Sequence, residues 1–134
     1  MKRSTLDLLV EKPRIVTGTV VADWNSGVAT SGLAGADLFT FGEVGQWFRL
    51  TEAYLVLAGF NLASTVTIRV FLTIAGEERM MPEDEWEPAV DGDLAFILWF
   101  WEVQLFGILR IEVYSDQAAD DGFEATYEYR VKNW

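Results

Sequence analysis

The chain of 134 residues contains no cysteine and no histidine. The absence of cysteine excludes disulfide bonds, thiolate metal ligands and a thiol nucleophile. The absence of histidine removes the commonest general base and the commonest transition-metal ligand. Basic residues are also scarce, with ten Lys and Arg against twenty-one Asp and Glu. The resulting net charge of −11 repels phosphate backbones, so we expect no nucleic-acid partner.

Long apolar segments and catalytic motifs are missing too. The longest uninterrupted apolar run, Leu94–Trp101, is too short to span a bilayer as a helix. The basic N-terminus leads into Leu6–Val10, which is short and contains Asp7, unlike the apolar core of a signal peptide. We therefore expect no membrane partner and synthesis in a cytoplasm. Neither a Gly-x-Ser-x-Gly motif nor a phosphate-binding Walker loop is present, and we expect no enzymatic activity.

What the chain does contain predicts one folded domain with an N-terminal arm. Hydrophobic residues make up 51% and aromatic residues 14%, which excludes a disordered chain. Residues 1–14 carry four basic and two acidic side chains, whereas the remainder is strongly acidic. We divide the chain into an arm, residues 1–14, and a β-domain, residues 15–134.

Alternation of apolar and polar residues predicts β-strands throughout the domain. In Ser64–Ile74, Val66, Ile68 and Val70 fall on one face, and Thr67 and Arg69 fall on the other. Similar patterns or β-branched residues predict eight strands in all: Arg14–Ala22, Asp37–Phe41, Trp47–Ala58, Ser64–Ile74, Glu78–Met81, Ala95–Glu102, Leu105–Tyr114 and Glu124–Lys132. The glycines at 32–35 and 42–45 are interpreted as turns around the strand at 37–41. The prediction is an all-β fold, a single antiparallel β-sandwich of about eight strands, jelly-roll-like.

The run Leu94–Trp101 does not alternate, so a strand there needs cover on both faces. In a two-layer sandwich one face would remain open, and such a patch marks an interaction surface. The cover would be the arm of the same chain, another subunit or a larger partner. The predicted interface residues are Leu6, Leu8, Leu9, Phe71, Phe96, Leu98, Trp99, Phe100, Trp101 and Trp134.

Two acidic loops, residues 82–93 and 115–122, are candidate ligand sites. Calcium takes six to eight oxygen ligands, and clustered loop carboxylates supply them. Neither loop has the residue order of an EF-hand, and solvated connections are the alternative interpretation. Trp86 lies in the first loop and is the candidate ring for stacking on a sugar. The candidate ligand and calcium residues are Trp86, Asp91, Asp93, Asp116, Asp120 and Asp121; no other cofactor is predicted.

Three stretches carry a resemblance to known proteins: Thr17–Trp24, Val66–Arg79 and Leu109–Tyr129 with its Ala-Ala-Asp-Asp-Gly loop. Over residues 17–131 the chain resembles small uncharacterised virion-associated β-sandwich proteins encoded by tailed bacteriophages. The resemblance implies a non-enzymatic virion structural protein, made in the host cytoplasm and located in the virion. It would be a capsid decoration, cement or accessory protein that forms a homo-oligomer, a dimer or trimer, and contacts a major capsid or tail protein.

Three alternatives to the capsid role stay open. One is a carbohydrate-binding, lectin-like module, and another is a small tail or fibre component. The third is a glycan-cleaving enzyme that uses a pair of the many carboxylates. The chain departs from the group in its aromatic run at 96–101 and in its basic arm. The resemblance brings no catalytic residues with it.

Overall fold

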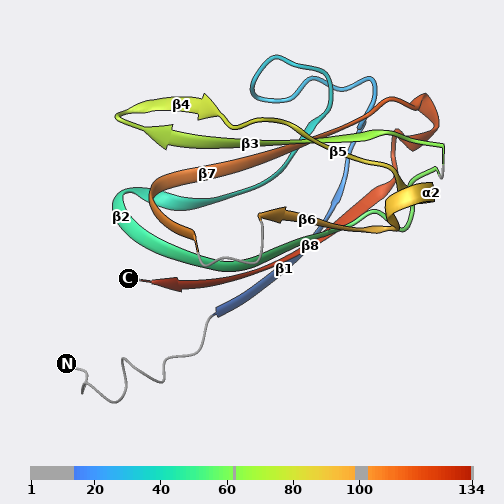
Figure 1. The fold of residues 1–134 in the computed structure, drawn as a ribbon. Helices are drawn as coiled ribbons and strands as arrows, with labels where there is room; N and C mark the ends of the chain where they lie inside the picture. Colours follow the sequence, from blue (N-terminus) through green and yellow to red (C-terminus); the bar gives the residue numbers. More distant parts are fainter. Residues whose placement is uncertain (1–13, 62, 99–102, 134) are drawn as a thin grey trace.

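The computed structural model describes residues 14–61, 63–98 and 103–133, which are nearly all antiparallel β-structure (Figure 1). The strands are β1 (Arg14–Val21), β2 (Ala36–Val56), β3 (Val66–Ile74), β4 (Glu77–Met80), β5 (Asp84–Trp86), β6 (Leu94–Leu98), β7 (Val103–Ser115) and β8 (Glu124–Asn133). One helical turn, α2 (Pro88–Asp91), and one 3-10 turn, η1 (Ala118–Asp120), interrupt them. Within the described part of the chain, no helix combines the length and the apolar character needed to cross a membrane.

The eight strands form one sheet in the order β1-β8-β2-β7-β3-β4, with β5 paired to β3 and β6 paired to β2. Every pair is antiparallel, which confirms the prediction of an all-β, antiparallel fold and the approximate number of strands. Both β4 and β5 lie along one edge of β3, and Pro82 separates them because it has no N–H for the ladder. The predicted arm, residues 1–14, lies outside the described residues except for Arg14, which begins β1.

The strand β2 pairs with different neighbours along its length. Residues 36–42 and 47–50 pair with β7, residues 48–56 pair with β8, and the last four of these also pair with β6. The sequence predicted two separate strands here, with glycine turns between them, and that prediction is wrong. Gly42 and Gly45 instead bend one continuous strand, because their positive φ angles let the chain turn while pairing resumes at Trp47.

The bend folds the sheet over its own core (Figure 1). Phe39, in the first part of β2, contacts the rings of Tyr127 and Tyr129 on β8, with centroids 4.6 and 4.8 Å apart. Within β2, only the second part pairs with β8. The contacts of Phe39 with the two tyrosine rings therefore cross the interior and do not follow the sheet. Trp24 and Leu55 are fully buried in the same cluster. Apolar burial of this kind stabilises the fold by about 25 cal/mol per Å².

Candidate functional site

The candidate site begins where β2 and β7 bend together. A Cβ atom on Gly42 would lie 2.2 Å from the carbonyl oxygen of Gly107. Gly42 and Gly107 also have φ angles of 99° and 113°, which residues with side chains rarely adopt. Glycine is therefore required for the two strands to approach and turn. Beyond the bend, Trp47 lies directly opposite Phe106.

Trp47 and Phe106 form an aromatic pair that is half open to solvent. Their ring centroids are 4.9 Å apart, with the planes tilted by 45°. Trp47 is 47% exposed and Phe106 is 52% exposed, while Val44, in the bend beside them, is 79% exposed. Clustered apolar side chains that remain this exposed mark an interaction surface.

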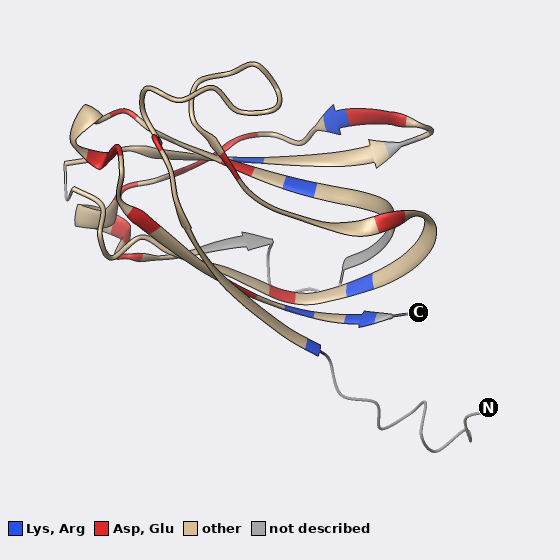
Figure 2. Cartoon of the chain, turned by 180° about the vertical axis from the view of Figure 1, so that it is seen from behind, with Lys and Arg blue, Asp and Glu red and all other residues tan. Residues whose placement is uncertain are grey.

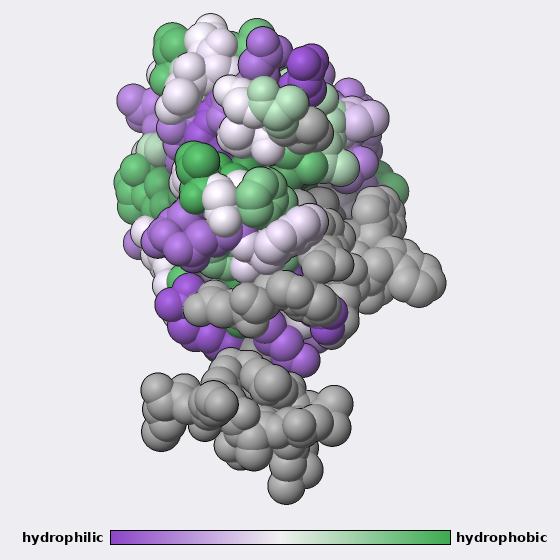
Figure 3. Space-filling model, turned by 90° about the vertical axis from the view of Figure 1, so that its left-hand side faces the viewer, coloured by the Kyte–Doolittle hydropathy of each residue, from purple (hydrophilic) through white to green (hydrophobic). Residues whose placement is uncertain are grey.

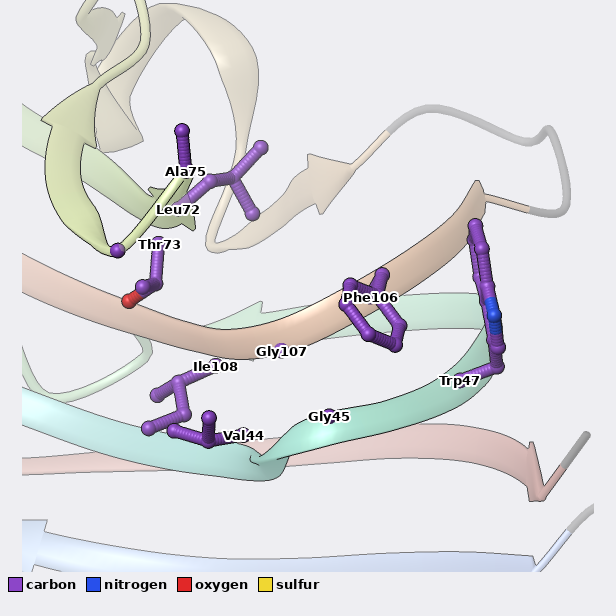
Figure 4. A pocket seen from close by; sticks show the side chains of 10 residues that line it. Val44, Gly45, Trp47, Leu72, Thr73, Ala75, Phe106, Gly107 and Ile108 are labelled. Atoms are coloured by element: carbon purple, nitrogen blue, oxygen red, sulfur yellow. The ribbon is translucent and has the colours of Figure 1, made fainter.

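The hairpin between β3 and β4 forms the facing wall. Leu72, Thr73, Ala75 and Gly76 line it. Figure 4 shows the first three of these across from Trp47 and Phe106, with Val44 and Ile108 beside the bend. We call the space between the two walls the apolar groove; its volume is about 650 Å³, within the range of about 300–1,000 Å³ typical of ligand pockets. Figure 3 looks onto this end of the molecule, where hydrophobic residues gather between hydrophilic ones.

The chemistry of the apolar groove is that of a binding surface. Its ten lining residues are Val44, Gly45, Trp47, Leu72, Thr73, Ala75, Gly76, Phe106, Gly107 and Ile108. Within this set, the Thr73 hydroxyl and the Trp47 indole N–H are the only polar side-chain groups. The lining therefore offers aromatic faces and aliphatic contacts, but no side chain that could act as a general acid or base near neutral pH.

An arginine on β7 holds the hairpin wall in place. Arg110 donates to the Glu78 carboxylate on β4 through Nε at 3.1 Å and Nη2 at 2.5 Å. The Arg110 side chain passes over β3, and its guanidinium lies 4.3 Å from the centroid of the Phe71 ring. Hydrogen bonding to Glu78 raises the pKa of Arg110 above its ordinary value. This bidentate pair is the geometry in which Arg–carboxylate bonds are strongest.

Arg110 belongs to a buried charge cluster centred on Glu112. The Glu112 carboxylate is fully buried and accepts bonds from Arg110, from Arg69 and from Ser31, whose N–H and Oγ lie 3.0 and 2.7 Å away. Burial acts to raise the pKa of Glu112, but the bonds from Ser31 and Arg110 outweigh it, and the pKa lies below its ordinary value. Arg69 also donates to the carbonyl oxygen of Ala34 at 2.6 Å. The cluster fastens the loop between β1 and β2 onto the sheet.

All Lys and Arg residues in the described part of the chain lie on strands, while acidic residues are spread over strands and loops (Figure 2).

The acidic loop residues predicted as calcium ligands mostly form hydrogen bonds with nearby backbone groups. Asp116 accepts from the N–H of Thr65 at 2.8 Å, and Asp91 accepts from the N–H of Glu87 at 3.0 Å. At Asp93, the backbone carbonyl accepts from the N–H of Leu57 at 2.6 Å.

The carboxylates of Asp120 and Asp121, like those of Asp91 and Asp116, accept hydrogen bonds within the chain. Asp121 accepts from the N–H groups of Asn25 and Ser26, and bonds from Ser26 and Asn25 lower its pKa. Asp120 is fully buried and accepts from two serine hydroxyls and one backbone N–H. Within the described residues, no three acidic side chains converge to hold a metal ion, so the structure does not bring the predicted calcium ligands together.

Trp86 is partly buried against the core, and its indole N–H donates to the carbonyl oxygen of Gly92 at 2.6 Å. Its polar group is thus used inside the chain. Phe71 requires a correction: we expected it on an open face, but it is 7% exposed in the single chain. The reason is that Arg110 covers the ring on what the strand pattern marks as the polar face.

Most of the other predicted interface residues fall outside the described part of the chain. Phe96 and Leu98 lie on β6, whose backbone pairs with β2. In this pairing Phe96 is opposite Tyr54, and Leu98 is opposite Ala53. The residues outside the description are Leu6, Leu8, Leu9, Trp99, Phe100, Trp101 and Trp134. The prediction of an interface at these positions stays a prediction.

The apolar groove is not among the sites that the sequence predicts. Trp47 counted as one of six tryptophans, and Phe106 as a residue of an ordinary strand. The available signal was the glycine pair at 42 and 45 together with Gly107, each beside an aromatic or β-branched residue. It could not be used without knowing that the two segments pair.

Comparison of the chain with models of protein families, with curated proteins and with solved structures gives no match. The geometry of the apolar groove is therefore the basis for a functional proposal.

Proposed function

We propose that the protein is a non-enzymatic structural protein of a tailed-phage virion, a capsid decoration or accessory protein that docks through the apolar groove. The half-exposed pair of Trp47 and Phe106 carries this proposal. The groove is uncharged in a chain whose net charge is −11. Apolar burial supplies the free energy of docking, and the acidic remainder keeps the free protein dispersed.

The order of the strands supports the virion role by analogy. Counted as two strands, β2 pairs through its second part with β8 and β6, and through its first part with β7, which also pairs with β3. The start of β7 follows the bend, since residues 103–106 pair with residues 47–50 of β2. We interpret this as a jelly-roll sandwich, the fold of many viral capsid and lectin domains. A fold alone does not fix a function, so this support is an analogy and the groove remains the physical argument.

The proposed occupant is a segment of the major capsid or tail protein that presents an aromatic or aliphatic side chain. Trp47 and Phe106 would close on it from one side and Leu72 from the other. Large, well-packed aromatic residues at the centre of an interface carry most of its binding energy. In the assembled virion, the arm at residues 1–14 adds contacts to neighbouring copies or to the shell, as the sequence predicts.

The test is co-sedimentation of the purified protein with virus particles that lack it. We expect saturable binding by the wild type, and binding weakened by at least about tenfold in Trp47→Ala and Phe106→Ala, as for central interface residues. Phe123→Ala is the matched control, because Phe123 is 41% exposed and precedes β8 at the opposite end of the sheet. Absence of wild-type binding, or equal losses in all three variants, would contradict the proposal.

A carbohydrate-binding module is the second candidate, and the same aromatic pair favours it. Half-exposed Trp and Phe rings offer the flat faces on which sugar rings stack. We assign the stacking role of this hypothesis to Trp47 instead of Trp86, since the Trp86 N–H is bonded internally and its ring is partly buried against the core. Binding to a glycan array that is lost in Trp47→Ala, combined with no binding to particles, would favour this candidate.

A further inference from the structure

The strand β1 is an edge strand without the features that normally protect an edge. It stands at the end of the sheet order and pairs only with β8, in eight consecutive residue pairs without a register shift. Beyond Arg14, the strand contains no charged residue and no proline. Natural edge strands are usually protected from pairing by charges, prolines or bulges. Within the described residues, nothing pairs with the other edge of β1.

The sequence of β1 is nearly the same in both directions. Around Gly18, the strand reads Ile15-Val16-Thr17-Gly18-Thr19-Val20-Val21. If two copies pair antiparallel about a two-fold axis at Gly18, Thr17 faces Thr19 of the partner subunit, and Val16 faces Val20 of the partner subunit. Ile15 then faces Val21 of the partner subunit. Every cross-strand pair joins like with like, and such pairs of β-branched and threonine residues are stabilising.

The exposure of these side chains fits such a pairing. Ile15 and Val21 are 57% and 60% exposed, although both are large and apolar. On the opposite face, Val16 and Val20 pack against the core but are only partly buried. A second strand along this edge would cover both pairs. Tyr127 already covers Gly18 on the inner face, since a Cβ there would lie 2.4 Å from the Tyr127 hydroxyl oxygen.

Charge also favours two copies of this edge. The seven residues 15–21 are neutral in a chain whose net charge is −11, so two acidic molecules approach here with the least repulsion. In the two-fold register, Arg14 faces Ala22 of the partner subunit and is one residue from Asp23 of the partner subunit. The basic and acidic residues at each end of the paired strands are thus separated by one position in the register.

We propose that two copies of this chain associate edge to edge through β1, antiparallel about a two-fold axis at Gly18, to make one continuous sheet. The pairing specifies how two copies contact one another in the assembly. It rests on the proposed virion function only for the claim that the protein self-associates. It does not involve the apolar groove, whose lining residues lie on β2, β3 and β7 and in the β3–β4 turn.

The first test is the oligomeric state of the full chain, measured by sedimentation velocity over a range of concentrations. We expect a dimer for the wild type. Ile15→Lys with Val21→Lys places like charges opposite each other twice, and we expect dimer dissociation at concentrations at least about tenfold higher. Ile15→Lys with Val21→Glu substitutes the same exposed positions but places opposite charges together, keeps the net charge of −11, and should restore the dimer.

The second test reads the register directly, because the chain has no cysteine of its own. Chains with Thr17→Cys are mixed with chains with Thr19→Cys, allowed to exchange, and oxidised. A disulfide needs Cα atoms within about 7 Å. Residue 17 of one copy and residue 19 of the other satisfy this condition when they face each other. Two residues 17, or two residues 19, lie diagonally across the paired strands and are too far apart. We expect a covalent dimer in the mixture and little in either variant alone.

Three results would overturn the pairing: a wild type that is monomeric at every concentration, a dimer that neither lysine variant changes, or a dimer that both double variants disrupt equally. None of these three results tests the docking proposal. That proposal depends on how strongly the Trp47 and Phe106 variants bind particles. Conversely, a dimer with the expected register that does not bind particles would leave the β1 pairing intact and refute only the docking function.

Discussion

Replacing Glu112 by glutamine should strongly destabilise the fold, although the two side chains have nearly the same shape. The Glu112 carboxylate is fully buried and lies between two buried arginines, Arg69 and Arg110. Glutamine keeps one carbonyl oxygen as an acceptor but presents an NH2 group to the donors on the other side. The substitution therefore leaves two buried cations without their shared counter-charge.

The expected magnitude follows from the contacts. Breaking a buried ion pair by removing one partner costs about 3–5 kcal/mol, because the remaining charge stays desolvated. Arg110 keeps its carboxylate partners Glu78 and Asp37, whereas among the described residues Arg69 has no other carboxylate partner and keeps the carbonyl oxygen of Ala34. We therefore expect the lower half of that range, about 3 kcal/mol. For a domain of this length that corresponds to a fall in Tm of about 10 °C.

The assay is urea and thermal unfolding followed by tryptophan fluorescence and circular dichroism. The matched control is Glu77→Gln, which removes the same charge from the 3.0 Å ion pair with Arg79, where both side chains are mostly exposed. Exposed pairs contribute about 0–1 kcal/mol, so the control should unfold almost like the wild type. If Glu112→Gln costs no more than Glu77→Gln, the buried cluster does not stabilise the fold as reasoned here.

Three further predictions follow from the described contacts. Asp120→Asn should cost about 2 kcal/mol in urea unfolding, because the amide cannot accept from two serine hydroxyls and a backbone N–H at once; an unchanged urea midpoint would contradict this. Glu112 and Asp37 have lowered pKa values in the folded state, so their contribution to stability is present above about pH 4.5 and is lost as pH falls through the folded pKa. The urea midpoint should therefore drop on acidification, and the drop should be smaller in Glu112→Gln. Gly42→Ala should destabilise the fold by at least about 1–2 kcal/mol, because its Cβ would meet the Gly107 carbonyl at a positive φ; stability equal to that of the wild type would argue against the required bend.

The strands β1, β3 and β8 agree well with the prediction from the sequence. The ends of β1 and β8 agree with the predicted strands to within one residue, and β3 begins two residues later than predicted. In β1 and β8, and at the start of β3, the side chains on one face are more buried than those on the other, so the pattern of residues records the burial. Local sequence is sufficient wherever the environment repeats with the period of the strand.

The bend in β2 and the apolar groove could not be predicted, because they depend on contacts between distant segments. Gly42 is a turn residue by composition, and its requirement for glycine comes from the Gly107 carbonyl on another strand. The same holds for Phe71, whose neighbours on the same face of the strand, Arg69 and Thr73, are polar but whose ring is covered by Arg110. We expected this ring to lie on an open interaction surface, and here it meets a charged side chain from the neighbouring strand.

The apolar groove and the β1 edge together make a further prediction, because a two-fold dimer carries two grooves. When two sites are linked, the second binds at an effective concentration of about millimolar, and avidity exceeds the single-site affinity by about 10²–10⁴. The lysine variant at Ile15 and Val21 leaves every lining residue of the groove unchanged, yet it should bind particles much more weakly than the wild type. The variant with lysine at 15 and glutamate at 21 should recover the loss. If the monomeric variant sediments with particles as tightly as the dimer, only one groove of each dimer engages the particle, and docking owes nothing to self-association.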